Sequence, residues 1–125
     1  MNTKEVETFE KIQLRLEGIY NEIKALSGKR PDDAINLFKL KLVNQVVLEA
    51  NKILQEKNLP FKGFAKFDEN DLPTNSDVVF ILSGYLGAFE KMRSDNIEMN
   101  MGRWYWKVGG DLSDIQTKVP QKLIK

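Results

Sequence analysis

The sequence predicts a mainly α protein: a three-helix up-down bundle, a long aromatic-rich connection after the second helix, and a C-terminal β-hairpin packed on the bundle. Apolar residues recur every three or four positions in residues 4–27, 32–57 and 77–99, as they do on one face of an amphipathic helix. Residues 103–108, RWYWKV, instead alternate with a period of two, which is typical of a strand. The whole chain of 125 residues has the length of one domain, so the hairpin, residues 103–119, is expected to lie on the helices.

The first predicted helix has a heptad seam. Its apolar residues are separated alternately by three and four positions; they are Phe9, Ile12, Leu16, Ile19, Ile23 and Leu26. About two and a half heptads are present, which suits one helix of an antiparallel bundle or a short dimer contact. Gly28, with a proline three residues later, predicts the end of this helix in a left-handed glycine cap.

The second and third predicted helices each have a candidate N-cap. Asp32 or Asp33 is expected to cap the second helix, and Thr74 with Asp77 has capping-box spacing before the third. Apolar residues cover nearly half of the second helix, which predicts a central position. Lys39 lies within that apolar sector; we interpret it as a side chain whose stem packs while its ammonium reaches water, with a buried functional lysine as the alternative.

Two glycines interrupt the third predicted helix. Gly84 and Gly87 lie opposite its densest apolar stripe, close to Phe80, and each costs about 1 kcal/mol relative to alanine. Glycines at such positions indicate that something approaches the helix backbone closely. We expect the approaching group to come from the C-terminal β element or from a second chain; a bend in the helix at the glycines is the third explanation.

The predicted hairpin has an apolar face and a basic face. In the strands 103–108 and 114–119, Trp104, Trp106 and Val108 share the face expected to pack on the helices. The opposite face and the tail carry basic side chains and one tyrosine, which resembles a small surface for single-stranded nucleic acid: Arg103, Tyr105, Lys107, Lys118 and Lys122. The more acidic residues 59–77 are expected to attract this basic segment within the chain, with a polyanion as the alternative partner.

The composition excludes several classes of site. The chain has no histidine and no cysteine, which removes His- or Cys-based zinc sites, Cys nucleophiles and Ser-His-Asp triads. Glu49, near the edge of the second helix's apolar sector, is the one carboxylate singled out; one acid without a partner does not make a catalytic site, so we expect no catalytic, metal or cofactor residues. No apolar run has the length of a bilayer span and the N-terminus has no apolar signal segment, so a cytoplasmic location without membrane contact is expected.

The sequence favours a small non-enzymatic interaction protein that binds a protein partner or itself. An accessory, inhibitor or immunity-type subunit would have these features, with contacts expected at Leu37, Leu48, Phe80, Gly84 and Gly87. A nucleic-acid-binding module that uses the basic hairpin is the alternative. A histidine-free enzyme that relies on carboxylates and a divalent metal ion is the second alternative.

Overall fold

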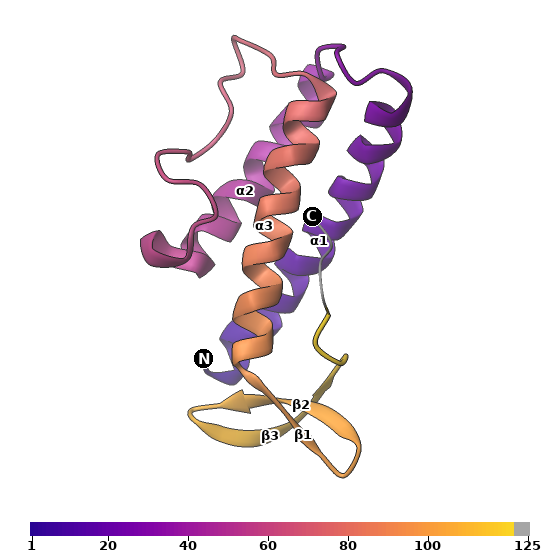
Figure 1. Ribbon diagram of the computed structural model, residues 1–125. Coiled ribbons are helices and arrows are strands. Elements are labelled where there is room, and N and C mark those ends of the chain that lie inside the picture. The colour runs from indigo at the N-terminus through magenta and orange to yellow at the C-terminus, as the bar shows by residue number, and fades with distance from the viewer. Residues whose placement is uncertain (122–125) are drawn as a thin grey trace.

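The computed structural model describes residues 1–121 and consists of a helical bundle with a small sheet at one end (Figure 1). Three helices precede a three-stranded antiparallel sheet, which confirms the mainly helical class and the C-terminal β element. The elements are α1 (Thr3–Lys29), α2 (Leu37–Asn58), α3 (Asn75–Asp95), β1 (Ile97–Asn100), β2 (Arg103–Val108) and β3 (Asp111–Thr117).

The helices α2 and α3 begin at the same end of the bundle and run in the same direction (Figure 1). The residues just before each helix are hydrogen-bonded to one another: Ile35 N–H donates to the Pro73 carbonyl at 2.9 Å, and Asn75 N–H to the Asp33 carbonyl at 2.9 Å. Residues 59–74 therefore return the chain along the side of the bundle. The predicted up-down order holds for α1 and α2 but not for α3. The helix α2 is kinked at Gln55, and the connection is long enough to return from its end to the level of its first residue.

The core confirms the heptad seam of α1. Phe9 is completely buried, and its ring stacks on that of Phe89 with 4.7 Å between centroids. The apolar sector of α2 is narrower than predicted, because Phe38 is 71% exposed, whereas the polar Asn44 is buried. Asn44 is stable there because its side-chain amide exchanges two 2.9 Å hydrogen bonds with the backbone of Phe67.

Two predicted helix ends differ from the observed ones. The second helix begins at Leu37, not at Asp32 or Asp33, because Asn36 provides the cap and accepts from a backbone N–H at 3.2 Å. The first helix continues through Gly28, which does not adopt the left-handed conformation, and ends at Lys29. The cap predicted for the third helix is confirmed, since the Thr74 hydroxyl accepts from the Asp77 N–H at 3.1 Å.

The C-terminal element is a three-stranded meander instead of a single hairpin. The predicted helix 77–99 ends at Asp95, and Ile97–Asn100 form the additional strand β1. Two-residue turns with positive φ at both positions, Met101-Gly102 and Gly109-Gly110, join the strands. Because the second turn is this short, β3 begins at Asp111, three residues before the predicted start at 114. It ends at Thr117, two residues before the predicted end at 119.

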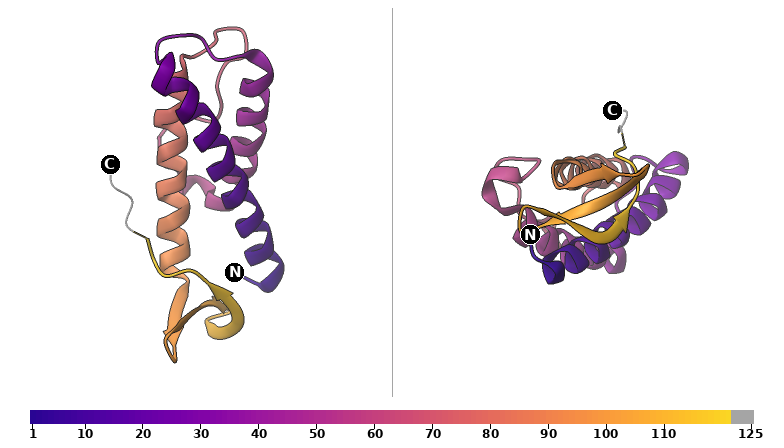
Figure 2. Two further views of the ribbon diagram at one scale, coloured as in Figure 1. Left: turned by 90° about the vertical axis from the view of Figure 1, so that its right-hand side faces the viewer. Right: turned by 90° about the horizontal axis from the view of Figure 1, so that it is seen from below.

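The sheet covers the end of the bundle where α1 begins and α3 ends (Figure 2). Trp106 is completely buried and its ring lies edge-on to Phe9 at 5.2 Å, which confirms the inward tryptophan face. Gly109 N–H donates to the Met1 carbonyl at 3.2 Å and ties the second turn to the start of α1. Within residues 1–121, the buried indole Nε1 of Trp106 has no hydrogen-bond acceptor.

Candidate functional site

An open cavity of about 1530 Å³ lies along the outer side of α3 and brings together three of the predicted contact residues. Phe80, Gly84 and Gly87 all line it, and Phe80 is 64% exposed at its edge. Leu37 and Leu48 do not line it; they are 43% and 42% exposed on α2. We call this cavity the α3 groove; its other walls are the end of α2 with the following turn and the start of α1.

The close approach predicted at Gly84 is made by Phe61, from the connection between α2 and α3. A methyl group on Gly84 would overlap ring atoms Cε2 and Cζ of Phe61. The Phe61 ring lies between the helix backbone and Phe80, with 5.4 Å between the two ring centroids. Within the chain, the residue that approaches Gly84 is therefore Phe61 of the connection and not the β element; contact with a second chain stays a prediction.

The backbone of α2 is strained where it forms a wall of the α3 groove. Gln55 has φ 60° and ψ 170° inside the helix, a region that only glycine occupies without steric cost. Strain of this kind costs about 1–3 kcal/mol and persists only when the surrounding structure enforces it. Gln55 lines the α3 groove, so the strained residue lies in its wall.

Four lysines and three acidic residues line the α3 groove; of the acids, Asp95 pairs with Lys91 and Glu90 with Arg93. Lys4, Lys52 and Lys57 line it, and none of the three forms an ion pair with another residue of the described range 1–121. Lys91 also lines it but pairs with Asp95 at 3.2 Å. The apolar lining includes Ile53, Ala88 and Met92. Glu5 is the one acidic lining residue without an ion pair in residues 1–121, so the unpaired charges are three lysines and one glutamate.

A buried ion pair on α3 holds the end of the described chain. The Arg93 side chain, only 2% exposed, donates to both Glu90 carboxylate oxygens at 2.9 and 2.6 Å. The same guanidinium donates to the Thr117 hydroxyl at 2.9 Å and to the carbonyls of Lys118 and Val119 at 2.8 Å each. We call this arrangement the C-terminal latch. Sequence reasoning missed it, although the Glu-x-x-Arg spacing beside an apolar stripe was a usable signal.

Glu90 is held in its charged form by the latch. Burial by itself would raise the pKa of this carboxyl, but the hydrogen bond and charge of Arg93 and the Gln121 N–H at 2.8 Å outweigh it. Gln13 adds a longer hydrogen bond, and the pKa of Glu90 lies below its ordinary value. The latch therefore anchors the sheet and the segment after it to α3.

The basic hairpin face contains more negative charge than predicted. Glu98 lies directly opposite Tyr105 in the register of β1 and β2, on the face that also carries Arg103 and Lys107. Tyr105 and Lys107 are half-buried, and Lys118 contributes its carbonyl to the latch. Lys122 lies outside the described residues. The predicted phosphate-binding face is therefore interrupted by a carboxylate.

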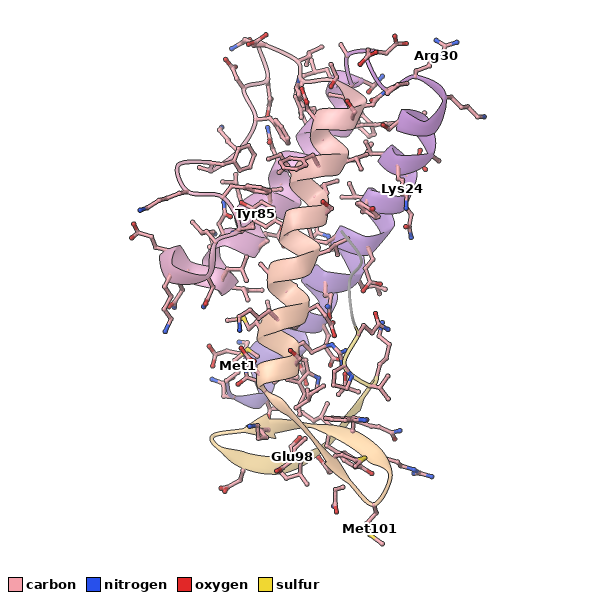
Figure 3. All side chains as sticks on the ribbon, viewed as in Figure 1. Met1, Lys24, Arg30, Tyr85, Glu98 and Met101 are labelled. Carbon is pink, nitrogen blue, oxygen red and sulfur yellow. The ribbon has the colours of Figure 1, made fainter. Side chains whose placement is uncertain are left out.

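The basic segment lies on the sheet, whereas the acidic connection runs along the side of the bundle towards the opposite end. Figure 3 shows Glu98 and Met101 on the sheet, while Arg30 lies at the far end of the bundle, beside the segment that precedes α3. No ion pair within residues 1–121 joins the two segments. Among the described residues the expected intramolecular attraction is not made by an ion pair, while Lys122 and Lys125 of the basic segment lie outside them.

Two further residues singled out from the sequence pair α1 with α2. Lys39 Nζ lies 2.9 Å from Glu22 Oε1, and its side chain is 32% exposed, as expected for a packed stem with a solvated ammonium. Glu49 accepts from Arg15 at 2.7 Å. Both are interhelical ion pairs. Within residues 1–121, no group of three or more acidic side chains is placed to hold a metal ion.

Across residues 1–121 no helix is both long and apolar enough to cross a membrane. Comparison of the chain with protein-family models, with curated proteins and with solved structures finds no match. The functional argument therefore depends on the geometry of the chain itself.

Proposed function

We propose that this chain is a non-enzymatic protein-interaction domain that receives an apolar segment of a protein partner, or of a second copy, in the α3 groove. The observation that supports it most is the open groove itself, about 1530 Å³ in volume, with Phe80 64% exposed at its edge. Exposed aromatic side chains beside a concave surface are typical of binding interfaces. An accessory, inhibitor or immunity-type subunit would act through such a surface.

Two properties of the groove walls add support. The strained Gln55 backbone is of the kind that concentrates at binding sites. The unpaired lysines Lys4, Lys52 and Lys57 favour a partner segment that carries acidic side chains. The nucleic-acid alternative has weaker support, because Glu98 lies within the face that would contact phosphates.

The test fills the groove without altering the core. Ser83 lines the groove and is exposed, so Ser83→Trp is expected to block the groove while the fold is retained. Gln45→Trp is the matched control, because Gln45 is an exposed polar residue of α2 that lines neither described cavity. Light scattering over a concentration series measures self-association of all three proteins.

Partner binding is measured with the same three proteins. Proteins retained from an extract of the source cells are identified, and each candidate is reconstituted from purified components with a measured Kd. We expect the dimer or the reconstituted complex to form with wild type and Gln45→Trp and to weaken at least tenfold with Ser83→Trp. A monomer at every concentration, with no complex sensitive to Ser83→Trp, would contradict the proposal.

A further inference from the structure

A second, smaller cavity lies between the connection 59–74 and α3, and three of its nine lining residues are phenylalanines. Its volume is about 480 Å³, within the range of small-ligand sites, and Phe64, Phe67 and Phe80 line it. The Phe64 and Phe67 rings meet edge-on with 5.0 Å between centroids, and Phe64 is also edge-on to Tyr85 at 6.4 Å. These contacts keep two of the three rings in place.

The charged residues that line this cavity are both acidic. They are Asp71 and Asp77, and neither carboxylate forms an ion pair within residues 1–121. The neighbouring carboxylates are used by the connection itself, because Asp68 accepts from the Asn70 N–H and Glu69 from the Asn44 amide. The cavity thus combines aromatic rings with two negative charges that have no counter-charge of their own.

Aromatic faces and carboxylates together attract organic cations. The negative face of an aromatic ring attracts an ammonium or guanidinium group, and a nearby carboxylate adds a charge-assisted hydrogen bond. An anion would be repelled by Asp71 and Asp77, and a neutral apolar group would gain nothing from them. We propose that this cavity binds the side chain of an arginine or lysine presented by a partner protein. Phe80 also lines the α3 groove, so one partner segment could reach both, but the cation site stands on its own residues.

The two carboxylates are not equivalent. Asp77 is in the first turn of α3, where the helix dipole already offsets part of its charge. A role limited to supporting the helix end would explain Asp77 without any ligand, but it would not explain Asp71. Asp71 is therefore expected to contribute more of the attraction for a cation.

The experiment is an NMR titration of the ¹⁵N-labelled full chain with short capped peptides. The probes are acetyl-Gly-Arg-Gly-amide and acetyl-Gly-Lys-Gly-amide; acetyl-Gly-citrulline-Gly-amide is the neutral control with nearly the same shape as arginine. We expect the two cationic peptides to shift amide signals of residues 64–81, with the citrulline peptide binding about tenfold more weakly. Asp71→Asn and Phe80→Leu should each lower the affinity for the arginine peptide by about threefold to tenfold.

Asp32→Asn is the matched control, because it removes the same charge from an exposed residue that lines neither cavity. It should leave the affinity for the arginine peptide within about twofold, since an exposed charge outside the site is screened by solvent and salt. Equal binding of the arginine and citrulline peptides would overturn the inference. Equal losses with Asp32→Asn and Asp71→Asn would also overturn it, because they would indicate only a general field of negative charge. A failure here leaves the Ser83→Trp result as a separate test of the proposed function, because Ser83 lines the α3 groove and not this cavity.

Discussion

Replacing Arg93 with methionine should destabilise the protein strongly, because it leaves the Glu90 carboxylate charged and buried. The two side chains are 2% and 10% exposed, so water cannot replace the lost guanidinium fully. Removing one partner of a buried ion pair costs about 3–5 kcal/mol, a large share of the roughly 5–15 kcal/mol that stabilises a typical domain. Methionine retains most of the apolar stem, so the loss reports mainly the charge and its hydrogen bonds.

Urea unfolding at pH 7, followed by tryptophan fluorescence and circular dichroism, measures the change. With an m value of about 2 kcal/mol/M, a loss of about 4 kcal/mol lowers the midpoint by about 2 M. Lys91→Met is the matched control, because the Lys91–Asp95 pair is on the same helix but its side chains are 79% and 61% exposed. An exposed pair of this kind contributes about 0.5 kcal/mol or less.

A double variant separates the buried charge from lost packing. Glu90→Gln with Arg93→Met removes both charges, and we expect its unfolding free energy to lie within about 2 kcal/mol of wild type. If Arg93→Met costs less than 1 kcal/mol, or if the double variant is less stable than Arg93→Met, the account of the latch is wrong.

The latch also sets part of the pH dependence of stability. Because the pKa of Glu90 is lowered in the folded state, its contribution is present above the unfolded value of about 4.3 and is lost as the pH falls through the folded value. The difference in unfolding free energy between wild type and Glu90→Gln should therefore be constant above about pH 5 and shrink below it. Urea titrations at intervals down to pH 3 measure this difference, and a difference that grows on acidification contradicts the assignment.

Three other features of the fold give further expected results. Gln55→Gly should raise the unfolding free energy by about 1–2 kcal/mol in urea titrations, because glycine relieves the strained backbone; an unchanged or lower value contradicts the strain. Gly18→Ala should raise the unfolding free energy by about 1 kcal/mol, because nothing lies near the added methyl group. Gly84→Ala should not raise it unless Phe61 is also replaced by alanine. Equal gains in unfolding free energy for Gly18→Ala and Gly84→Ala would contradict the Phe61 contact. Burial raises the pKa of Tyr85 to about 12, so ultraviolet titration should show a tyrosine ionisation near pH 12 that Tyr85→Phe removes. The stability that the neutral phenol contributes is present below about pH 10 and is lost as the pH rises towards 12.

The elements with strong local patterns were predictable from the sequence. The heptad spacing from Phe9 identified α1 and its buried face, and the hydroxyl of Thr74 was correctly assigned as a cap. The alternation around Trp106 predicted both a strand and the side that it buries. In each case the information lies within a few neighbouring residues, where side-chain period and backbone capping act.

The candidate sites were only partly predictable. Phe80, Gly84 and Gly87 were expected to lie near a contact, but the ring that approaches Gly84 comes from Phe61, which the sequence does not connect to it. The aromatic cavity likewise needs Phe64 and the distant α3 to lie side by side. Neither spacing nor composition specifies which face of a helix a long connection will cover.

The sequence by itself determined the helices, the tryptophan strand and the absence of histidine and cysteine chemistry. Only the tertiary structure decided the direction of α3, because the regular spacing of Phe61, Phe64 and Phe67 does not indicate which way the connection 59–74 runs. It also decided that Ile97–Asn100 form a strand, since four residues are too few to distinguish helix from strand without the partner β2. Besides the nearby Glu90, the guanidinium of Arg93 is held in the core by carbonyls 25 and 26 residues further along the chain. Contacts of that range depend on the whole packed fold, so no local pattern encodes them.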